Sequence, residues 1–174
     1  FRTGAMPVPT ALVRRAAEHG FKVCRSYGSS ECPTFTLNWP DNAEDKLAHT
    51  EGRPVPGGIV ATLGDDGAIN DASVEGELLL RSPEMFKGYT DPALNDCFIE
   101  GWFRTGDIGL VDEDGFVVLT DRSKDIVNRG GEKISSRDVE EQLALMPAIS
   151  EVAVVPSPHD LLGEVVCAVV ILKP

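Results

Sequence analysis

Residues 108–119 read IGLVDEDGFVVL, two short apolar runs on either side of a polar turn. The turn, Asp112-Glu113-Asp114-Gly115, combines acidic residues with a glycine, a composition that reverses the chain between two strands. We therefore expect a β-hairpin with strands at 108–111 and 116–119.

The segments before this hairpin show the same pattern of short apolar runs and polar turns. Residues 58–63 and 76–81 are strand-like, and a polar turn, Gly64-Asp65-Asp66-Gly67, follows the first of them. Short strands joined by polar turns predict an antiparallel barrel or bent sheet over residues 51–121.

Both ends of the chain add helices and further strands. Pro9 and Thr10 can begin a helix that Gly20 ends, and residues 21–25 form a strand that leads into the turn at 27–31. Residues 135–138 resemble a capping box, followed by a helix that Pro147 ends. Residues 149–155 and 165–172 are expected strands, the latter buried because it is wholly apolar. The fold class is thus mixed, α/β and α+β.

The composition is typical of a soluble globular protein, and no apolar run predicts a membrane span. The 174 residues are 42% hydrophobic and 25% charged, and the longest apolar run has eight residues. A net charge of -12 argues against nucleic acid as a partner. The four cysteines form no CxxC pair, which favours free thiols in a reducing cytoplasm.

The negative charge is unevenly spread. Residues 1–121 carry a net charge of -10 and residues 122–174 only -2. Residues 122–133 include four basic residues and two acidic ones. This basic segment is either an anion site or a chance cluster on a solvated loop.

Residues 27–31, YGSSE, are the first candidate site. Tyr27 can offer a flat ring surface, and Gly28 permits close approach of a ligand to the backbone. Ser30 can bond a phosphate, and Glu31 supplies the hard oxygen that Mg²⁺ prefers. Taken alone, the pentapeptide also fits an ordinary turn at a strand end.

Two further motifs follow. In 101–107, GWFRTGD, Asp107 can accept two hydrogen bonds from a ribose diol, or it can stabilise its own turn. In 121–135, DRSKDIVNRGGEKIS, Arg122 can fork onto hydroxyls or phosphate oxygens, and Gly130-Gly131 permits unusual backbone angles.

In this order the motifs resemble those of the AMP-forming adenylating enzymes, which include acyl- and aryl-CoA synthetases. YGSSE is similar to the family's Y-G-x-T-E, and GWFRTGD to its G-W-F-x-T-G-D. GEL at 76–78 with KGY at 87–89 is similar to its G-E-L…G-Y segment. DRSKD with RGGE at 129–132 resembles its hinge segment G-R-x-K-D…G-G-E, with Asp121 in place of the usual glycine.

The resemblance implies a role for each matching residue around the nucleotide. Tyr27 would pack against the adenine, with Gly28 beside it in the nucleotide site. Ser30 would contact the phosphate, and Glu31 would hold the Mg²⁺. Asp107 and Arg122 would bind the ribose. Gly4-Ala5 is similar to the family's G-A-P segment beside the acyl and adenine pockets.

Residues after 122 would serve the second half of the reaction. Lys124 falls at the family's hinge, and Gly130 and Gly131 would line the tunnel for the thiol. ATP and a small carboxylate would give an acyl-adenylate with release of pyrophosphate, and coenzyme A would then take the acyl group. Mg²⁺ and cationic side chains would control the charge.

The implied architecture is part of a larger enzyme. Residues 1–121 would be the end of the large AMP-binding domain, and 122–174 a hinge with an incomplete small domain. The family's phosphate loop and terminal catalytic lysine do not occur in the sequence. We therefore expect an internal fragment that is inactive alone.

Other functions compete with this one. A non-catalytic interaction module would use the same motifs as turns and caps. A nucleotide-binding oxidoreductase lacks its G-x-G-x-x-G signature, and a glycosidase built on Glu31 and Asp107 leaves the basic segment without a purpose. Within the family, a carrier protein is the alternative acceptor to coenzyme A.

Overall fold

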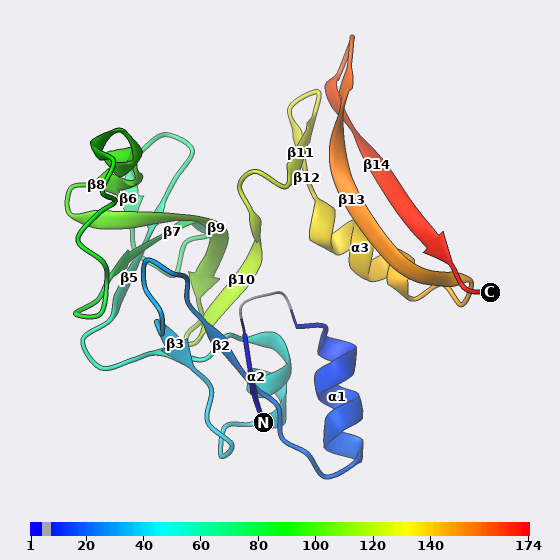
Figure 1. Cartoon of the computed structure of the whole chain (residues 1–174), viewed down its shortest axis with the longest axis horizontal. Coiled ribbons are helices and arrows are strands. Elements are labelled where there is room, and N and C mark those ends of the chain that lie inside the picture. The colour runs from blue at the N-terminus through cyan, green and yellow to red at the C-terminus, as the bar shows by residue number, and fades with distance from the viewer. Residues whose placement is uncertain (5–7) are drawn as a thin grey trace. The chain divides into compact units, whose positions relative to one another are not determined.

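The structure is a computed structural model that describes residues 1–4 and 8–174. The chain forms two compact units, Phe1–Leu119 and Thr120–Pro174 (Figure 1). The first unit has two sheets and the second has one. In the described part of the chain, no helix has the length and apolarity needed to cross a lipid bilayer.

The first unit begins with a small mixed sheet and two helices. The sheet order is β1-β2-β3-β4, in which β1 and β2 run parallel and the other pairs antiparallel. The elements are β1 (Arg2–Thr3), α1 (Thr10–Glu18), β2 (Cys24–Tyr27), β3 (Thr36–Leu37), α2 (Glu44–His49) and β4 (Arg53–Pro54). The predicted first helix is confirmed, and the strand after it lies three residues later than expected.

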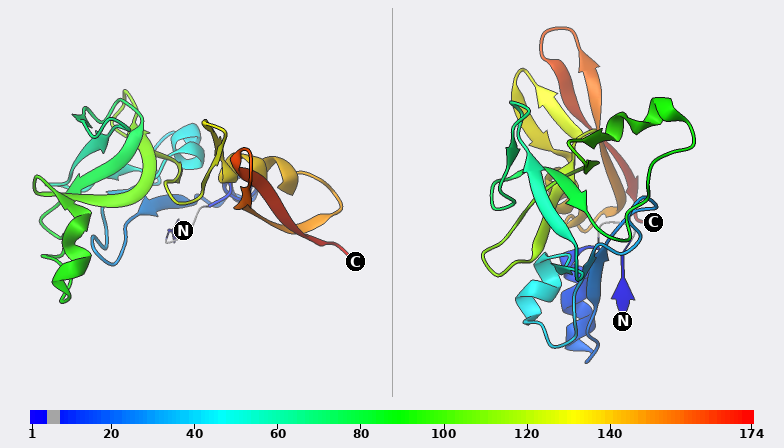
Figure 2. Two further views of the ribbon diagram at one scale, coloured as in Figure 1. Left: turned by 90° about the horizontal axis from the view of Figure 1, so that it is seen from above. Right: turned by 90° about the vertical axis from the view of Figure 1, so that its left-hand side faces the viewer.

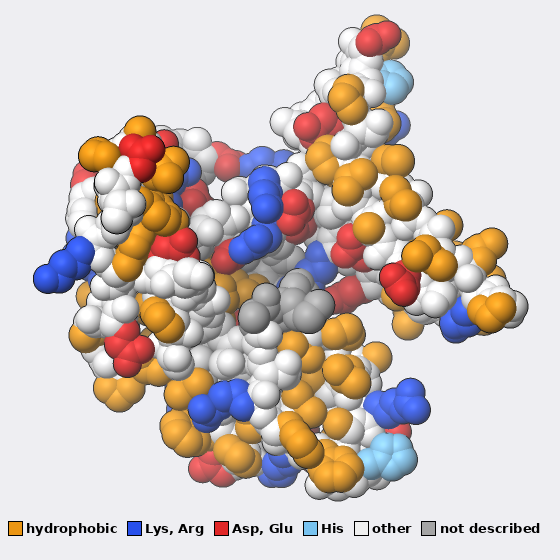
Figure 3. Space-filling view, viewed as in Figure 1, with side chains coloured by type: hydrophobic (Ala, Val, Ile, Leu, Met, Phe, Trp, Pro, Cys, Tyr) orange, Lys and Arg blue, Asp and Glu red, His pale blue; other side chains and the backbone are white. Residues whose placement is uncertain are grey.

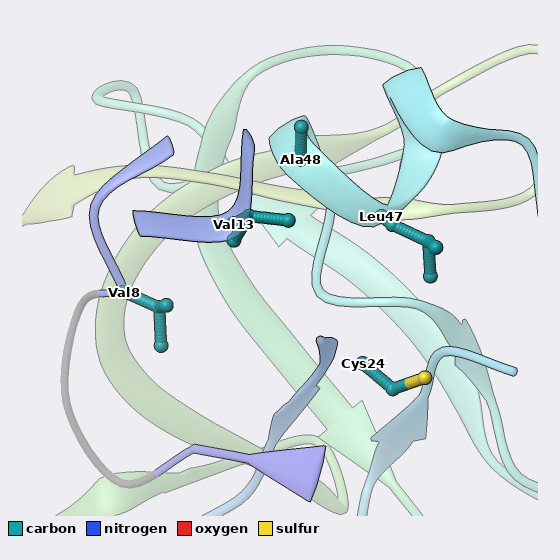
Figure 4. Close-up of a cluster of buried hydrophobic side chains, with 5 residues drawn as sticks. All are labelled: Val8, Val13, Cys24, Leu47 and Ala48. Carbon is teal, nitrogen blue, oxygen red and sulfur yellow. The ribbon is translucent and has the colours of Figure 1, made fainter. Parts of the chain in front are cut away.

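A small core holds these helices on the sheet. Val13 of α1, Leu47 and Ala48 of α2, and Cys24 of β2 are all buried and pack together with Val8 (Figure 4). Burial of such side chains stabilises the fold by roughly 1.5–3 kcal/mol for each large one. The helices are therefore fixed by packing, since each is too short to be stable alone.

The second sheet of this unit is antiparallel, with strand order β10-β9-β7-β5-β6 and β8 paired to β9. The predicted hairpin at 108–119 is confirmed, and Asp112 N donates to Phe116 O across its turn at 2.9 Å. The elements are β5 (Ile59–Leu63), β6 (Ile69–Asn70), β7 (Gly76–Arg81), the 3₁₀ helix η1 (Pro92–Cys97), β8 (Phe98–Ile99), β9 (Trp102–Val111) and β10 (Val117–Arg122).

Strand β9 differs from the expectation because it already begins at Trp102. The expected turn at Thr105-Gly106 is instead an irregularity inside the strand, where the register with β7 shifts between Glu77 and Leu79. Gly106 has φ +72°, a left-handed conformation that glycine adopts without strain. The bulge re-aims the side chains that follow it, which is a common use of bulges beside functional sites.

The two sheets of the first unit share a core and a backbone connection. Phe35, Leu78, Leu80 and Val117 are almost fully buried and cluster with Cys32. The Val117 N–H donates to Gly52 O, and the Val117 carbonyl accepts from Glu51 N, each at 2.8 Å. These bonds join the residues before β4 to β10 in the second sheet.

An ion pair lies within this packing. The guanidinium of Arg25 is 2% exposed and bonds the carboxylate of Glu51, which is also buried. A second guanidinium nitrogen donates to Ala48 O at the end of α2, at 2.7 Å. The pair thus ties β2 to α2 and to the residues before β4.

The second unit is a four-stranded sheet with order β12-β11-β14-β13 and one helix. Its elements are β11 (Ile126–Arg129), β12 (Glu132–Ser135), α3 (Ser136–Ala144), β13 (Ile149–His159) and β14 (Gly163–Leu172). The long β13–β14 pair is drawn in orange and red (Figure 2). Ser135 caps α3, since its Oγ accepts from Asp138 N at 3.1 Å, as the sequence predicts.

The strand predicted at 165–172 is confirmed as part of β14, but the prediction that it is buried is wrong. Val169 and Leu172 are 59% and 64% exposed, and hydrophobic side chains gather on the surface over β13 and β14 (Figure 3). The reason is that α3 packs against β13, whereas β14 pairs with β11 at one position, Arg129 with Gly163, in the described residues. An apolar run indicates a strand, but what covers the strand depends on its neighbours.

Candidate nucleotide site

Tyr27 and Asp107, from different sheets, meet in the first unit. The Tyr27 hydroxyl donates to Asp107 Oδ2 at 2.6 Å across 80 residues of sequence. Tyr27 lies at the end of β2, where its backbone N–H donates to Thr36 Oγ1 at 3.1 Å and its carbonyl accepts from Phe35 N at 3.0 Å. Both residues are therefore fixed on strands, as a precise binding site requires.

Asp107 is 7% exposed and is held by its own neighbours on β9. Its backbone N–H donates to Thr105 Oγ1 at 3.0 Å, and that hydroxyl donates to Leu78 O on β7 at 2.9 Å. The Asp107 carboxylate thus accepts a hydrogen bond from a tyrosine that is distant in sequence. A buried carboxylate acceptor of this kind suits a diol ligand.

Glu77 stabilises the bulge that carries Asp107. Its Oε1 accepts from Gly106 N at 3.0 Å, and its Oε2 forms an ion pair with Arg104 at 2.7 Å. The Glu77 carboxylate in turn raises the pKa of Arg104. One side chain on β7 therefore satisfies the backbone group that the register shift leaves without a strand partner.

The loop after Tyr27 is tightly constrained. A side chain at Gly28 would place Cβ 2.5 Å from Pro33 O, so only glycine fits there. Ser29 Oγ accepts from Glu31 N and Cys32 N at 3.2 and 3.3 Å. Ser30 is exposed at the tip of this turn, a position from which its hydroxyl can reach a ligand.

Glu31 is oriented from outside its own loop. The Tyr89 hydroxyl donates to Glu31 Oε1 at 2.5 Å. This hydrogen bond lowers the pKa of Glu31. Because only the neutral phenol can donate it, the bond also raises the pKa of Tyr89 to about 12. The Glu31 carboxylate is therefore charged at neutral pH, which metal binding requires.

A magnesium ion fits this single carboxylate. In residues 1–4 and 8–174 the structure holds no cluster of three His, Cys, Asp or Glu side chains suited to a metal. Mg²⁺ usually uses one or two carboxylates together with substrate phosphates and waters. Glu31 meets that requirement, whereas a zinc or calcium site would need more protein ligands.

Gly4 lies beside this site, and Ala5 lies outside the described residues. A Cβ on Gly4 would be 2.6 Å from Ser26 O, one residue before Tyr27. The Ser26 hydroxyl also donates to Thr3 O at 3.2 Å. The absence of a side chain at Gly4 therefore lets β1 approach β2.

The predicted residues of the second unit lie at a strand end and on turns. Arg122 and Lys124 are exposed, the first at the end of β10 and the second in the turn that follows. Gly130 and Gly131 form the two-residue turn between β11 and β12, with φ values of +61° and +97°. Positive φ at both positions is what such a hairpin requires, and glycine supplies it.

The supporting contacts of three residues were not predicted from the sequence. Thr105 and Glu77 lie inside matched motifs, but their contacts with Asp107 and Gly106 depend on the register of β7 and β9. Tyr89 also lies in a matched motif, and its contact with Glu31 spans 58 residues. The motifs select all three residues, but the spacing of the motifs does not predict their hydrogen-bond partners.

Known proteins are similar to this chain in sequence. Residues 1–90 match the AMP-binding enzyme family, and residues 138–174 match the AMP-binding enzyme C-terminal domain. The peroxisomal benzoate–CoA ligase of Arabidopsis thaliana is 36% identical over 98% of this chain and 32% of its own length. A long-chain-fatty-acid–CoA ligase of Mycobacterium tuberculosis is 37% identical over 98% of this chain and 34% of its own.

A solved structure agrees with these relatives. The o-succinylbenzoate coenzyme A synthetase of Bacillus subtilis, in complex with ATP and magnesium, superimposes with a TM-score of 0.85 at 32% identity. The match covers 99% of this chain and 36% of that one. The fold and the matched motifs define the class of adenylating enzymes.

The chain belongs to the AMP-binding enzyme family. It spans about a third of the length of the relatives it matches. The predicted mixed fold class, with the end of a large adenylating domain followed by part of a small α+β domain, is confirmed by this likeness.

Proposed function

We propose that the protein carrying this chain is an ATP-dependent, AMP-forming carboxylate–CoA ligase. A carboxylate oxygen of the acid would attack the α-phosphorus of ATP, and the bond to pyrophosphate would break. The thiol of coenzyme A would then lose its proton and attack the acyl carbon, releasing AMP. The names of the relatives, which are CoA ligases, support this acceptor.

The contact between Tyr27 and Asp107 carries the proposal. It joins two motifs 80 residues apart through one hydrogen bond of 2.6 Å. An aromatic ring beside a carboxylate suits a nucleoside, because the base can stack on the ring while the ribose hydroxyls donate to Asp107. A set of unrelated turns would not be expected to bring these two groups together.

The remaining residues of the first unit would handle the phosphates. Gly28 keeps the loop close to the core, and Ser30 at its tip would donate to a phosphate oxygen. Glu31 would hold Mg²⁺, which when bound neutralises charge on the phosphates. Gly4 would let the strand β1 lie beside Tyr27, close to the adenine.

The second unit would serve the change between the two half-reactions. Arg122 would donate to the ribose, and Lys124 would lie at a hinge on which residues 122–174 rotate against 1–121. The turn Gly130-Gly131 would line the path of the thiol. The surrounding basic residues suit a ligand as anionic as coenzyme A.

The cysteines and the net charge bear on the compartment and the partners of the protein. All four cysteines are free thiols, which fits a reducing compartment such as the cytoplasm. The substrate would be a small carboxylate, and no nucleic acid would take part, since the net charge is -12.

Pyrophosphate exchange tests this function. We expect the protein that carries this chain to incorporate labelled pyrophosphate into ATP only when a suitable carboxylic acid is present. Coenzyme A should then be consumed in proportion to AMP release. Exchange that is independent of every acid in a broad panel, or release of ADP in place of AMP, would contradict the proposal.

A further inference from the structure

Tyr89 has a specific contact to which the proposed function gives no role. It lies in the segment between β7 and η1, and its hydroxyl donates to Glu31 Oε1 at 2.5 Å. The two residues come from separate segments, so this bond is not a consequence of local sequence. Glu31 is on a turn where a long side chain has several accessible rotamers.

Tyr89 is itself fixed by one side chain. Its backbone N–H donates to Asn95 Oδ1 at 2.7 Å, and its carbonyl accepts from Asn95 Nδ2 at 3.2 Å. Gly88 makes this possible, because a Cβ there would lie 2.8 Å from Asn95 Oδ1. Asn95 therefore holds both backbone polar groups of Tyr89.

Phe86 fixes the same segment from the other side. Its ring packs edge-to-face on Tyr89 at 4.9 Å and stacks on Phe98 at 5.4 Å. Its backbone N–H donates to the carbonyl of Glu31 at 2.7 Å. Residues 86–89 thus hold Glu31 at two points, the backbone through Phe86 and the carboxylate through Tyr89.

We infer that Tyr89 is a positioning residue that orients the Glu31 carboxylate for the magnesium ion of bound ATP. The inference rests on the proposed function, in which Glu31 holds that ion. A carboxylate already held in one orientation loses less rotamer freedom when the cation binds. Partners that hold a metal ligand in this way typically change metal affinity by about 10- to 100-fold when removed.

The variant Tyr89→Phe tests the inference, because it keeps the ring on Phe86 and removes only the hydroxyl. ATP binding to the protein that carries this chain is measured by calorimetry, in EDTA and over a series of magnesium chloride concentrations. We expect the magnesium concentration for half-maximal enhancement of ATP binding to rise about tenfold. ATP affinity in EDTA should stay at the wild-type value. Thr90→Val removes the exposed hydroxyl of the next residue and should leave both values unchanged.

A second variant and a double variant complete the design. Asn95→Ala releases the backbone of Tyr89 and should shift the magnesium dependence in the same direction, by a smaller factor. In a Glu31→Gln background, Tyr89→Phe should have no additional effect, since the hydroxyl acts through that carboxylate.

Three outcomes would overturn the inference. An unchanged magnesium dependence in Tyr89→Phe removes the positioning role alone. Equal weakening of ATP binding with and without magnesium shows a structural role only. A wild-type protein whose ATP binding ignores magnesium overturns the proposed role of Glu31, and the role of Tyr89 with it.

Discussion

The candidate residues of the two units are held in opposite ways. In Phe1–Leu119, Asp107 is 7% exposed and is surrounded by hydrogen bonds from strands and loops far apart in sequence. In Thr120–Pro174, Lys124 and the Gly130-Gly131 turn are exposed, and the long strand β14 leaves Val169 and Leu172 uncovered. A residue held in its binding geometry by hydrogen bonds binds its ligand more tightly, because its conformational entropy is already lost on folding and not on binding.

The difference suggests separate tasks. The first unit would present a preformed nucleotide site, and the second would supply charged groups whose positions are set by a later event. Changes to supporting residues should therefore have large effects in the first unit and small ones in the second.

The largest effect is expected from the buried ion pair. Arg25→Met leaves the Glu51 carboxylate buried without its partner, which typically costs about 3–5 kcal/mol. Urea unfolding should show this loss. Arg129→Met, on an exposed arginine of β11, should change the unfolding free energy by less than about 0.5 kcal/mol. Equal losses in the two variants would contradict the contrast between the units.

A pair of threonines separates support of the site from support of the fold. Thr105→Val removes the hydroxyl between Leu78 O and Asp107 N, and Thr62→Val removes one that donates to Val74 O at 2.8 Å. Each should lower the unfolding free energy by about 1–2 kcal/mol. ATP affinity should fall only in Thr105→Val. If Thr62→Val weakened ATP binding as much, the bulge would have no special function.

A smaller effect is expected at the cap of α3. Ser135→Ala removes the acceptor for Asp138 N and should cost about 1 kcal/mol, measured by thermal unfolding of the second unit. Ser123→Ala, at an exposed turn, serves as the control. A change in ATP affinity in Ser135→Ala, measured below its unfolding temperature, would mean that the helix supports the nucleotide site.

The smallest effect concerns pH and the hairpin turn. Burial raises the pKa of Asp112, but hydrogen bonds from Lys46 and the Phe116 N–H outweigh it, so the net pKa lies below its ordinary value of 3.8. The stabilisation is fully present above that value and is lost as pH falls through the lower folded-state pKa. Asp112→Asn should therefore reduce the loss of stability on acidification. An identical acid profile in the variant would show that Asp112 contributes nothing to it.

The sequence predicts local elements well where turn chemistry marks their ends. The hairpin at 108–119 and the cap at Ser135 are both found this way. It fails at 105–106, where a glycine with positive φ belongs to a bulge inside a strand. Composition alone does not distinguish a turn from a bulge.

The site is predicted as a set of residues but not as an arrangement. Motif matches select Tyr27 and Asp107, yet their bond depends on how two sheets pack. Tyr89 and the buried pair of Arg25 with Glu51 have no signal in spacing, because their partners are brought together by tertiary structure. The exposure of β14 likewise follows from where α3 packs and not from its own sequence.

We propose that Asp107, held beside Tyr27, binds the ribose of ATP. The decisive measurement is calorimetry of ATP binding to the wild type and to Asp107→Asn, with inorganic triphosphate as a ligand without ribose. We expect the variant to bind ATP about 10- to 100-fold more weakly, as loss of charged hydrogen bonds implies, and triphosphate equally well. Equal ATP affinity in both proteins, or an equal loss for triphosphate, would contradict it.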